Sequence, residues 1–149
     1  MEQSVNKVAF NATLHCLTGC ALGEVSGVVI GTAFGWGNLA TLAAGIVLAF
    51  VFGYSLTVRS LLRAGVALTA AAKLAFASDT LSIATMEVVD TTVLVFWPAA
   101  MEATLLTPLF WGSLMVSLFV AFWAAYPVNR YLLARGKGHA LVHHHHVHH

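Results

Sequence analysis

The sequence predicts an all-α integral membrane protein, a bundle of four transmembrane helices whose termini are cytoplasmic. Of the 149 residues, 59% are hydrophobic and only 9% are charged, whereas a soluble domain carries about 25% charged residues. The hydrophobic residues form four long stretches, and each reaches the roughly 20 apolar residues that a membrane helix needs. All seven basic residues fall outside these stretches, on one side of the predicted bundle.

The composition also excludes other classes of protein. Seven basic and six acidic side chains cannot solvate the surface of a water-soluble enzyme of this length. The same composition excludes a disordered chain, which has a low hydrophobic fraction. A nucleic-acid-binding protein would need a basic patch, and none is present.

The predicted spans follow one another with short connections. They are residues 8–34, 39–58, 74–97 and 104–126. The first span contains one charged residue, Glu24, and a Gly-rich turn at 35–38 separates it from the uncharged second span. The fourth span is also uncharged, and Pro127 is expected to end it because proline breaks the helical hydrogen-bond pattern. Residues 1–138 therefore form the transmembrane domain, and 139–149 form a His-rich tail.

The basic residues predict the orientation. With four spans, both termini and the 59–73 connection lie on one side, and that side holds all seven Lys and Arg residues. The opposite connections hold no basic residue and a single acidic one, Glu102. By the positive-inside rule the basic side is cytoplasmic, so we expect a multi-pass protein of a prokaryotic inner membrane.

The third span contains three carboxylates, although ionisable groups inside a bilayer are costly and are functional candidates by default. At 100° per residue, one face of about 100° collects the polar side chains of this span. These side chains are Asp79, Met86, Glu87 and Asp90. The opposite face is apolar and suits lipid, with Leu81, Ala84, Val88 and Val95. Such a helix must turn its polar face toward the interior of the bundle.

The first span has a similar polar face. Cys16, Cys20 and Glu24 are spaced by four residues and share a face, and His15 lies beside Cys16. Next to this face runs a stripe of small residues with the same spacing, Gly19, Gly23, Gly27 and Gly31. Such a stripe is typical of closely packed membrane helices. Because both spans start from the cytoplasmic side, we expect their polar faces to meet at matching depths and to line one interior cavity.

These side chains point to a cation. No Lys or Arg lies inside a span to balance the carboxylates, so a metal ion or a chain of protons must supply the positive charge. Thiol and thioether ligands favour Cu(I), while His and carboxylate ligands extend the choice to zinc or iron. The sequence therefore predicts a transition-metal site, with copper favoured. The candidate ligands are His15, Cys16, Cys20, Glu24, Asp79, Met86, Glu87 and Asp90, with His139 and His143 from the tail.

Several short segments together resemble a known family. They are Ala-Thr-Leu-His-Cys-Leu-Thr-Gly-Cys at 12–20, Asp-Thr-Leu-Ser-Ile at 79–83, Met-Glu-Val-Val-Asp at 86–90, Pro-Val-Asn-Arg at 127–130 and Gly-Lys-Gly-His at 136–139. This set resembles a prokaryotic multi-pass membrane family of unknown function. The resemblance covers nearly the whole chain and implies a four-helix membrane domain. It also implies that the Gly-Lys-Gly-His segment is native, and it implies no activity.

The sequence leaves three functions open. The first is a membrane protein that binds or transports a transition metal, with the lipid bilayer and the metal ion as its partners. The second is a membrane metalloenzyme, although the helices lack the repeated His-containing pairs of two-metal sites. The third is a structural subunit of a larger membrane complex. Because four helices are few for a transport path, we also expect a homo-oligomer.

Overall fold

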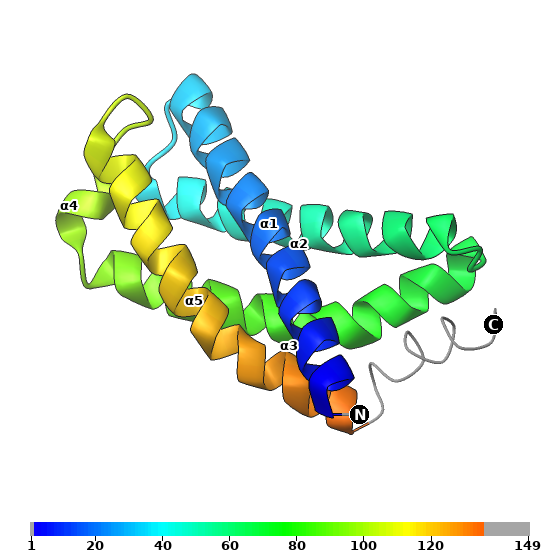
Figure 1. The fold of residues 1–149 in the computed structure, drawn as a ribbon. Coiled ribbons are helices and arrows are strands. Elements are labelled where there is room, and N and C mark those ends of the chain that lie inside the picture. The colour runs from blue at the N-terminus through cyan, green and yellow to red at the C-terminus, as the bar shows by residue number, and fades with distance from the viewer. Residues whose placement is uncertain (1, 136–149) are drawn as a thin grey trace.

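The computed structural model describes residues 2–135, which form five helices and no strand (Figure 1). The four long helices are α1 (Glu2–Phe34), α2 (Asn38–Arg63), α3 (Leu68–Val95) and α5 (Pro108–Ala134), and the short helix α4 (Pro98–Met101) lies between α3 and α5. The structure thus confirms the all-α class, the four long helices and the short connection after Phe34. It adds α4, a single turn begun by Pro98 where the sequence predicted only a loop.

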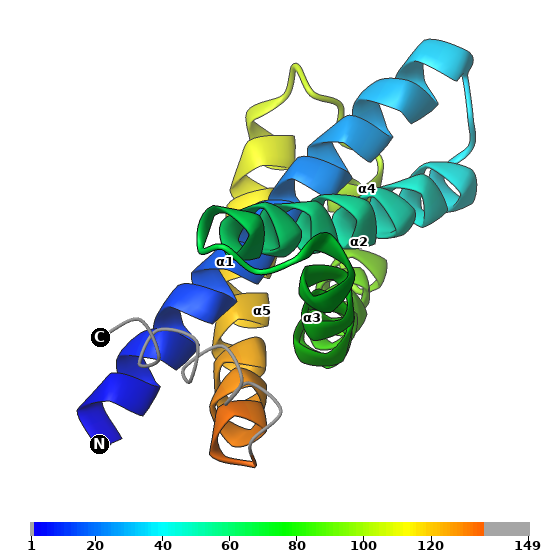
Figure 2. The ribbon, with the colours of Figure 1, turned by 90° about the vertical axis from the view of Figure 1, so that its right-hand side faces the viewer.

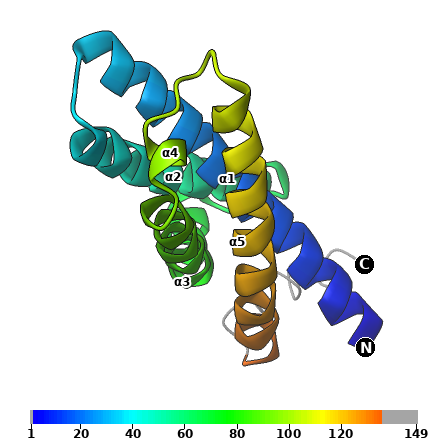
Figure 3. The ribbon, with the colours of Figure 1, turned by 90° about the vertical axis from the view of Figure 1, so that its left-hand side faces the viewer.

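The helices pack as two crossing pairs. The antiparallel hairpin of α2 and α3 crosses the pair formed by α1 and α5 (Figures 1 and 2). The most extensive contacts are those of α1 with α2 and of α3 with α5. Helix α3 contacts α1, α2 and α5, so its long inner face is enclosed by three neighbours (Figure 3).

Three of the long helices are apolar enough to cross a membrane. These candidate spans are Val5–Phe34, Asn38–Arg63 and Pro108–Ala134, which indicates a multi-pass membrane protein. Helix α3 is of similar length, with 28 residues, but its three carboxylates lower its apolar character. The sequence predicted four spans and the structure has three candidates, because the charged residues of α3 exclude it.

The two ends of the molecule differ in charge. The start of α1, the α2–α3 connection and the end of α5 lie toward the right of Figure 1, and the α1–α2 connection and α4 lie toward the left. Six of the basic residues fall within the described part of the chain, all of them toward the right-hand end of the helices and all exposed. They are Lys7, Arg59, Arg63, Lys73, Arg130 and Arg135. We call this end of the molecule the basic end.

The glycine stripe of α1 packs against a matching stripe of α2. A Cβ atom added to Gly27 would lie 2.6 Å from the Cα of Gly45, and one added to Gly19 would lie 2.7 Å from the Cα of Gly53. At Gly23 the added atom would overlap the backbone of Ala49. The predicted close approach is thus confirmed, and its partner is α2. Because the backbones touch over several turns, only residues without a side chain fit on the α1 side.

The predicted end of the last helix at Pro127 is wrong. Helix α5 continues through Pro127 to Ala134. Proline removes one backbone donor, but membrane helices tolerate this where neighbouring groups compensate. The turns after Pro127 bury Asn129, Leu132 and Leu133 against the bundle. This burial favours continuation of the helix over an end at the proline.

Replacing Gly23 with alanine is expected to destabilise the bundle by about 1–3 kcal/mol, the usual cost of overpacking a well-packed site. The added methyl group has no room between the α1 and α2 backbones. Gly112→Ala in α5 is the matched control, because nothing lies within 4 Å of its added Cβ. Thermal unfolding in detergent, followed by tryptophan fluorescence, measures both variants. Equal melting temperatures for Gly23→Ala and Gly112→Ala would contradict the predicted contact.

Candidate functional site

The three carboxylates of α3 are buried. Asp79 is 7% exposed, Glu87 5% and Asp90 2%. On the opposite face of the helix, Leu81 and Val88 are exposed. The predicted division of α3 into a polar inner face and an apolar outer face is therefore confirmed. The carboxyl groups that distinguish α3 from the candidate spans therefore face the interior of the protein.

The polar faces of α1 and α3 meet at three levels. Nearest the basic end, Cys16 lies beside Asp79 and Ser82. The next level, described below, joins Cys20 to Met86 and Glu87. At the third level Glu24 lies beside Asp90 and Glu87. The order along both helices is the one expected if α1 and α3 start from the same side. Met86 was expected near the depth of Glu24 and Asp90 beyond it, but Met86 lies level with Cys20 and Asp90 level with Glu24. We call this contact of α1 with α3 the polar seam.

The middle level of the seam is a pair of sulfur atoms. The Sγ of Cys20 lies 3.8 Å from the Sδ of Met86, and both side chains are only 1% exposed. Glu87, the next residue on α3, lies beside the Cys20 thiol. Both cysteines are free. The sulfur atoms belong to the packed core of the bundle, together with Cys16, Ala121 and Ala125.

The carboxylates of the seam have oxygen atoms without a hydrogen-bond partner. Within the described chain these buried atoms are Oε1 of Glu24, Oδ2 of Asp79, Oε1 of Glu87 and Oδ1 of Asp90. An unpaired buried oxygen of this kind is costly. Every Lys and Arg among residues 5–135 is exposed, whereas His15 lies within electrostatic range of Asp79.

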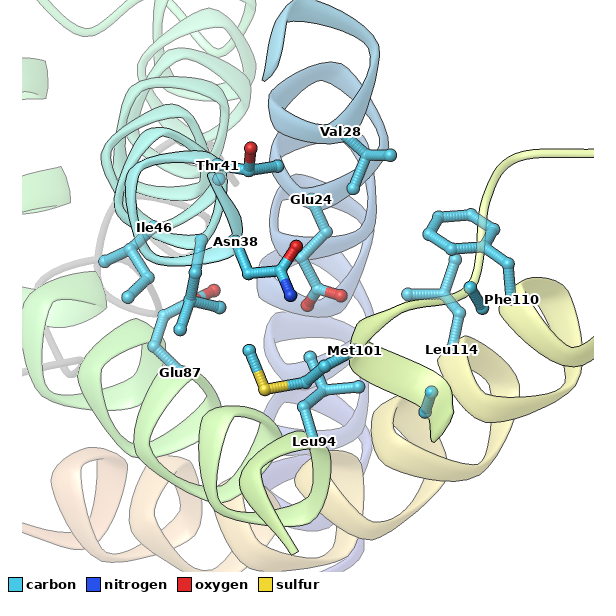
Figure 4. A pocket seen from close by; sticks show the side chains of 14 residues that line it. Glu24, Val28, Asn38, Thr41, Ile46, Glu87, Leu94, Met101, Phe110 and Leu114 are labelled. Atoms are coloured by element: carbon cyan, nitrogen blue, oxygen red, sulfur yellow. The ribbon is translucent and has the colours of Figure 1, made fainter. Parts of the chain in front are cut away.

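A cavity of about 90 Å³ lies at the end of the seam that is remote from the basic end. Glu24 and Glu87 line it, together with Asn38 and Thr41 from the first turn of α2 (Figure 4). Helix α4 contributes Met101, and apolar residues complete the wall. The apolar wall includes Val28, Ile46, Leu94, Phe110 and Leu114. The cavity is therefore polar on one side, where oxygen atoms are the available donors, and apolar on the other.

The structure divides the predicted site residues between cavity and core. Glu24 and Glu87 line the cavity, whereas Cys16, Cys20 and Met86 pack in the adjacent core. The polar residues of both helices were expected to line one cavity, but Asp79 and Asp90, like the sulfur residues, do not line this one. Thiol and thioether groups are weakly polar and fill core positions well, so the helices close around them.

The chain matches a known family over most of its length. Residues 5–138 match the family described as a domain of unknown function, DUF4396. The chain belongs to the DUF4396 family. No curated protein and no solved structure matches it. The resemblance to a membrane family of unknown function is consistent with this match.

No group of three or more His, Cys, Asp and Glu side chains that could hold a metal ion is assembled among residues 2–135 of this DUF4396 chain. His15 lies within electrostatic range of Asp79, and its Nε2 has no hydrogen-bond partner. His15 thus lies near the Asp79 end of the polar seam and not beside the Cys20–Met86 pair. His139 and His143 lie outside the described residues.

The sequence reasoning did not identify a hydrogen-bond cluster that joins three helices. The Nδ2 of Asn129 on α5 donates to Oγ1 of Thr13 at 2.9 Å and to Oγ of Ser82 at 2.9 Å. Ser117, also on α5, lies beside Asp90. Because the sequence placed the end of the last span at Pro127, Asn129 fell outside the predicted bundle and its spacing gave no signal. This cluster connects α1, α3 and α5 beside the Cys16 level of the seam.

Replacing Asn129 with leucine is expected to reduce stability by about 1 kcal/mol, within the range for hydrogen bonds between membrane helices. The change removes both amide donations, to Thr13 and to Ser82. A double-mutant cycle with Thr13→Val, read by thermal unfolding in detergent, isolates the Asn129–Thr13 contribution. A coupling of zero would show that this hydrogen bond does not stabilise the bundle.

Proposed function

We propose that this membrane protein binds a soft transition-metal ion within its helix bundle as cargo for transport or delivery, with Cu(I) favoured over zinc and iron. The observation that carries the proposal is the buried pair of Cys20 Sγ and Met86 Sδ, 3.8 Å apart, with Glu87 beside the thiol. Thiolate and thioether are the ligands that select Cu(I) among biological metals.

The separation of the two sulfur atoms suits a shared ion. Two sulfur ligands at about 2.3 Å from a tetrahedrally coordinated metal lie roughly 3.8 Å apart. Glu87 supports the site as a third donor because it lies beside Cys20. Cys16, one helical turn away in the same core cluster, is the proposed second thiol on the path of the ion.

The carboxylates supply the charge that such an ion needs. Asp79, Glu87 and Asp90 are buried, whereas every described Lys and Arg is exposed. Binding of a cation then replaces protons held by the thiol and the carboxyl groups, so binding releases protons and weakens as the pH falls. His15, His139 and His143 are proposed as ligands that receive the ion near the basic end.

A cargo site fits these residues better than a resident catalytic centre. Two-metal enzymes in helix bundles use several Glu and His ligands on facing helices, and the described residues assemble no group of three such side chains. The polar faces of α1 and α3 meet within one chain, so burial of the carboxylates does not require a second copy. A homo-oligomer remains proposed because four helices are few for a transport path.

We also propose that α3 is the fourth transmembrane span and that the basic end is cytoplasmic, in a prokaryotic inner membrane. Helix α3 turns its carboxylates inward and exposes Leu81 and Val88, which supports a helix with lipid on its outer face. All six described basic residues lie at one end of the molecule, as the positive-inside rule requires.

Reporter fusions test this topology. Alkaline phosphatase fused after Ala103 is expected to be active, because a spanning α3 places the α4–α5 connection outside the cytoplasm. A fluorescent protein that folds only in the cytoplasm, fused after His149, is expected to fluoresce. Inactive phosphatase after Ala103 would show that α3 does not cross the membrane. A phosphatase fusion after Gly65, in the basic α2–α3 connection, is the inactive control.

Metal binding is tested with Cu(I) alone, titrated against a chromophoric Cu(I) chelator into purified protein that lacks a histidine tag. Wild-type protein is expected to bind Cu(I) stoichiometrically, and Cys20→Ser or Met86→Leu should each weaken binding at least about tenfold, or roughly 1.4 kcal/mol. Met115→Leu is the matched control, because Met115 is 69% exposed whereas Met86 is 1% exposed. Absence of Cu(I) binding by the wild-type protein, or equal affinities in Cys20→Ser and Met115→Leu, would contradict the proposal.

A further inference from the structure

The cavity that Glu24 and Glu87 line is separate from the Cys20–Met86 pair. It is lined by residues of all five helices (Figure 4). These include α4 and the start of α2, which lie at the end opposite the basic end (Figure 1). The cavity volume of about 90 Å³ is enough for several water molecules. Two carboxylates, an amide and a hydroxyl line it, whereas Lys and Arg are absent from its lining among the described residues. Such a lining attracts a cation and repels an anion.

Glu87 connects this cavity to the sulfur pair. Its side chain lines the cavity and is only 5% exposed, and its Oε1 has no hydrogen-bond partner. The same side chain lies beside the Cys20 thiol. An ion in the cavity is therefore one carboxylate away from Cys20. Glu24 makes a similar connection, because it lines the cavity and lies beside Asp90.

Met101 adds a soft donor to the cavity. Its side chain extends from α4 into the same space as the side chains of Glu24 and Glu87 (Figure 4). Thioether ligands bind Cu(I) and discriminate against the hard cations that carboxylates alone would accept. The donors thus change from mixed oxygen and sulfur in the cavity to sulfur at the Cys20–Met86 pair.

We propose that this cavity is an entry port on the face opposite the basic end, through which a small cation reaches Glu24 and Glu87 and then the Cys20–Met86 pair. The inference rests on the proposed function for the identity of the ion. The cation-selective port itself does not depend on it. Met101 is the first thioether that the ion meets, and Glu87 is the carboxylate that it shares with the sulfur site.

Charge-selective labelling tests the port without any metal. The Met101→Cys variant is treated in intact cells with two membrane-impermeant methanethiosulfonate reagents of similar size, one cationic and one anionic. The rate of the cationic reagent divided by that of the anionic reagent is expected to be about tenfold higher at Met101→Cys than at Leu106→Cys. A cleft lined by negative charge raises the on-rate of cations by at least that factor. Leu106 is the control because it is 95% exposed and only a few residues from Met101. Wild-type protein, whose Cys16 and Cys20 are buried, gives the background.

The proposal requires that the carboxylates of Glu24 and Glu87 cause the preference for the cationic reagent. Glu87→Gln and Glu24→Gln, each combined with Met101→Cys, are expected to bring the ratio toward the value at Leu106→Cys. Ala103→Cys, which also lines the cavity, provides a second labelling position should Met101→Cys fail to fold. Equal cation-to-anion labelling ratios at the cavity and control positions would contradict the proposed entry port. A ratio that neither Gln variant changes would also contradict it.

The two proposals fail separately. If Cu(I) does not bind but the labelling is cation-selective, the port stands and its ion is not the soft metal. If Cu(I) binds at Cys20 and Met86 but the labelling shows no selectivity, the port is wrong and the ion enters elsewhere.

Discussion

The burial of three carboxyl groups inside the bundle is the constraint on which its arrangement depends. Asp79, Glu87 and Asp90 lie inside it, while every described Lys and Arg is exposed. A charged side chain at the centre of a membrane helix costs about 2.5–3.5 kcal/mol on scales from insertion experiments, so the proposed crossing of the membrane by α3 requires its polar side to be covered by protein. It is enclosed by α1, α2 and α5, and hydroxyl and amide groups from the neighbouring helices lie along the seam.

Close packing of α1 on α2 makes this enclosure possible. The contacts of Gly19, Gly23 and Gly27 with the α2 backbone bring the two helices nearly into backbone contact. Helix α3 then reaches both of them, because Ile83 of α3 packs against Gly53 of α2 and the Cys20–Met86 contact joins it to α1. Larger residues in the stripe would separate α1 from α2 and open the seam to lipid. The glycines therefore position the site although they carry no chemistry.

Much of the site follows from helical periodicity. The inner and outer faces of α3, the shared face of Cys16, Cys20 and Glu24, and the matching depths of the two helices were all predictable, because each depends only on residue spacing and on the direction of each helix. The partner of the glycine stripe was not assigned, although Gly45, Ala49 and Gly53 of α2 repeat its four-residue spacing.

Other features depend on tertiary packing that spacing does not encode. The course of α5 through Pro127 depends on burial of the residues that follow it. The cavity depends on α4, a single turn whose position is set by its contacts with α3 and α5. Asn129 meets Thr13 and Ser82 only because α1, α3 and α5 converge at one level. In each case the deciding contact joins residues far apart in the chain.

The distribution of donors along the seam has a physical logic. Carboxylates lose more hydration than sulfur when they are buried, and Glu24 and Glu87 adjoin a cavity with room for water. Thiol and thioether groups lose little, and Cys20 and Met86 occupy the closed core. Beyond them Asp79 and His15 continue the polar side chains toward the basic end. Polar groups therefore lie on both sides of the sulfur pair, which is the arrangement that the proposed passage of an ion along the seam requires.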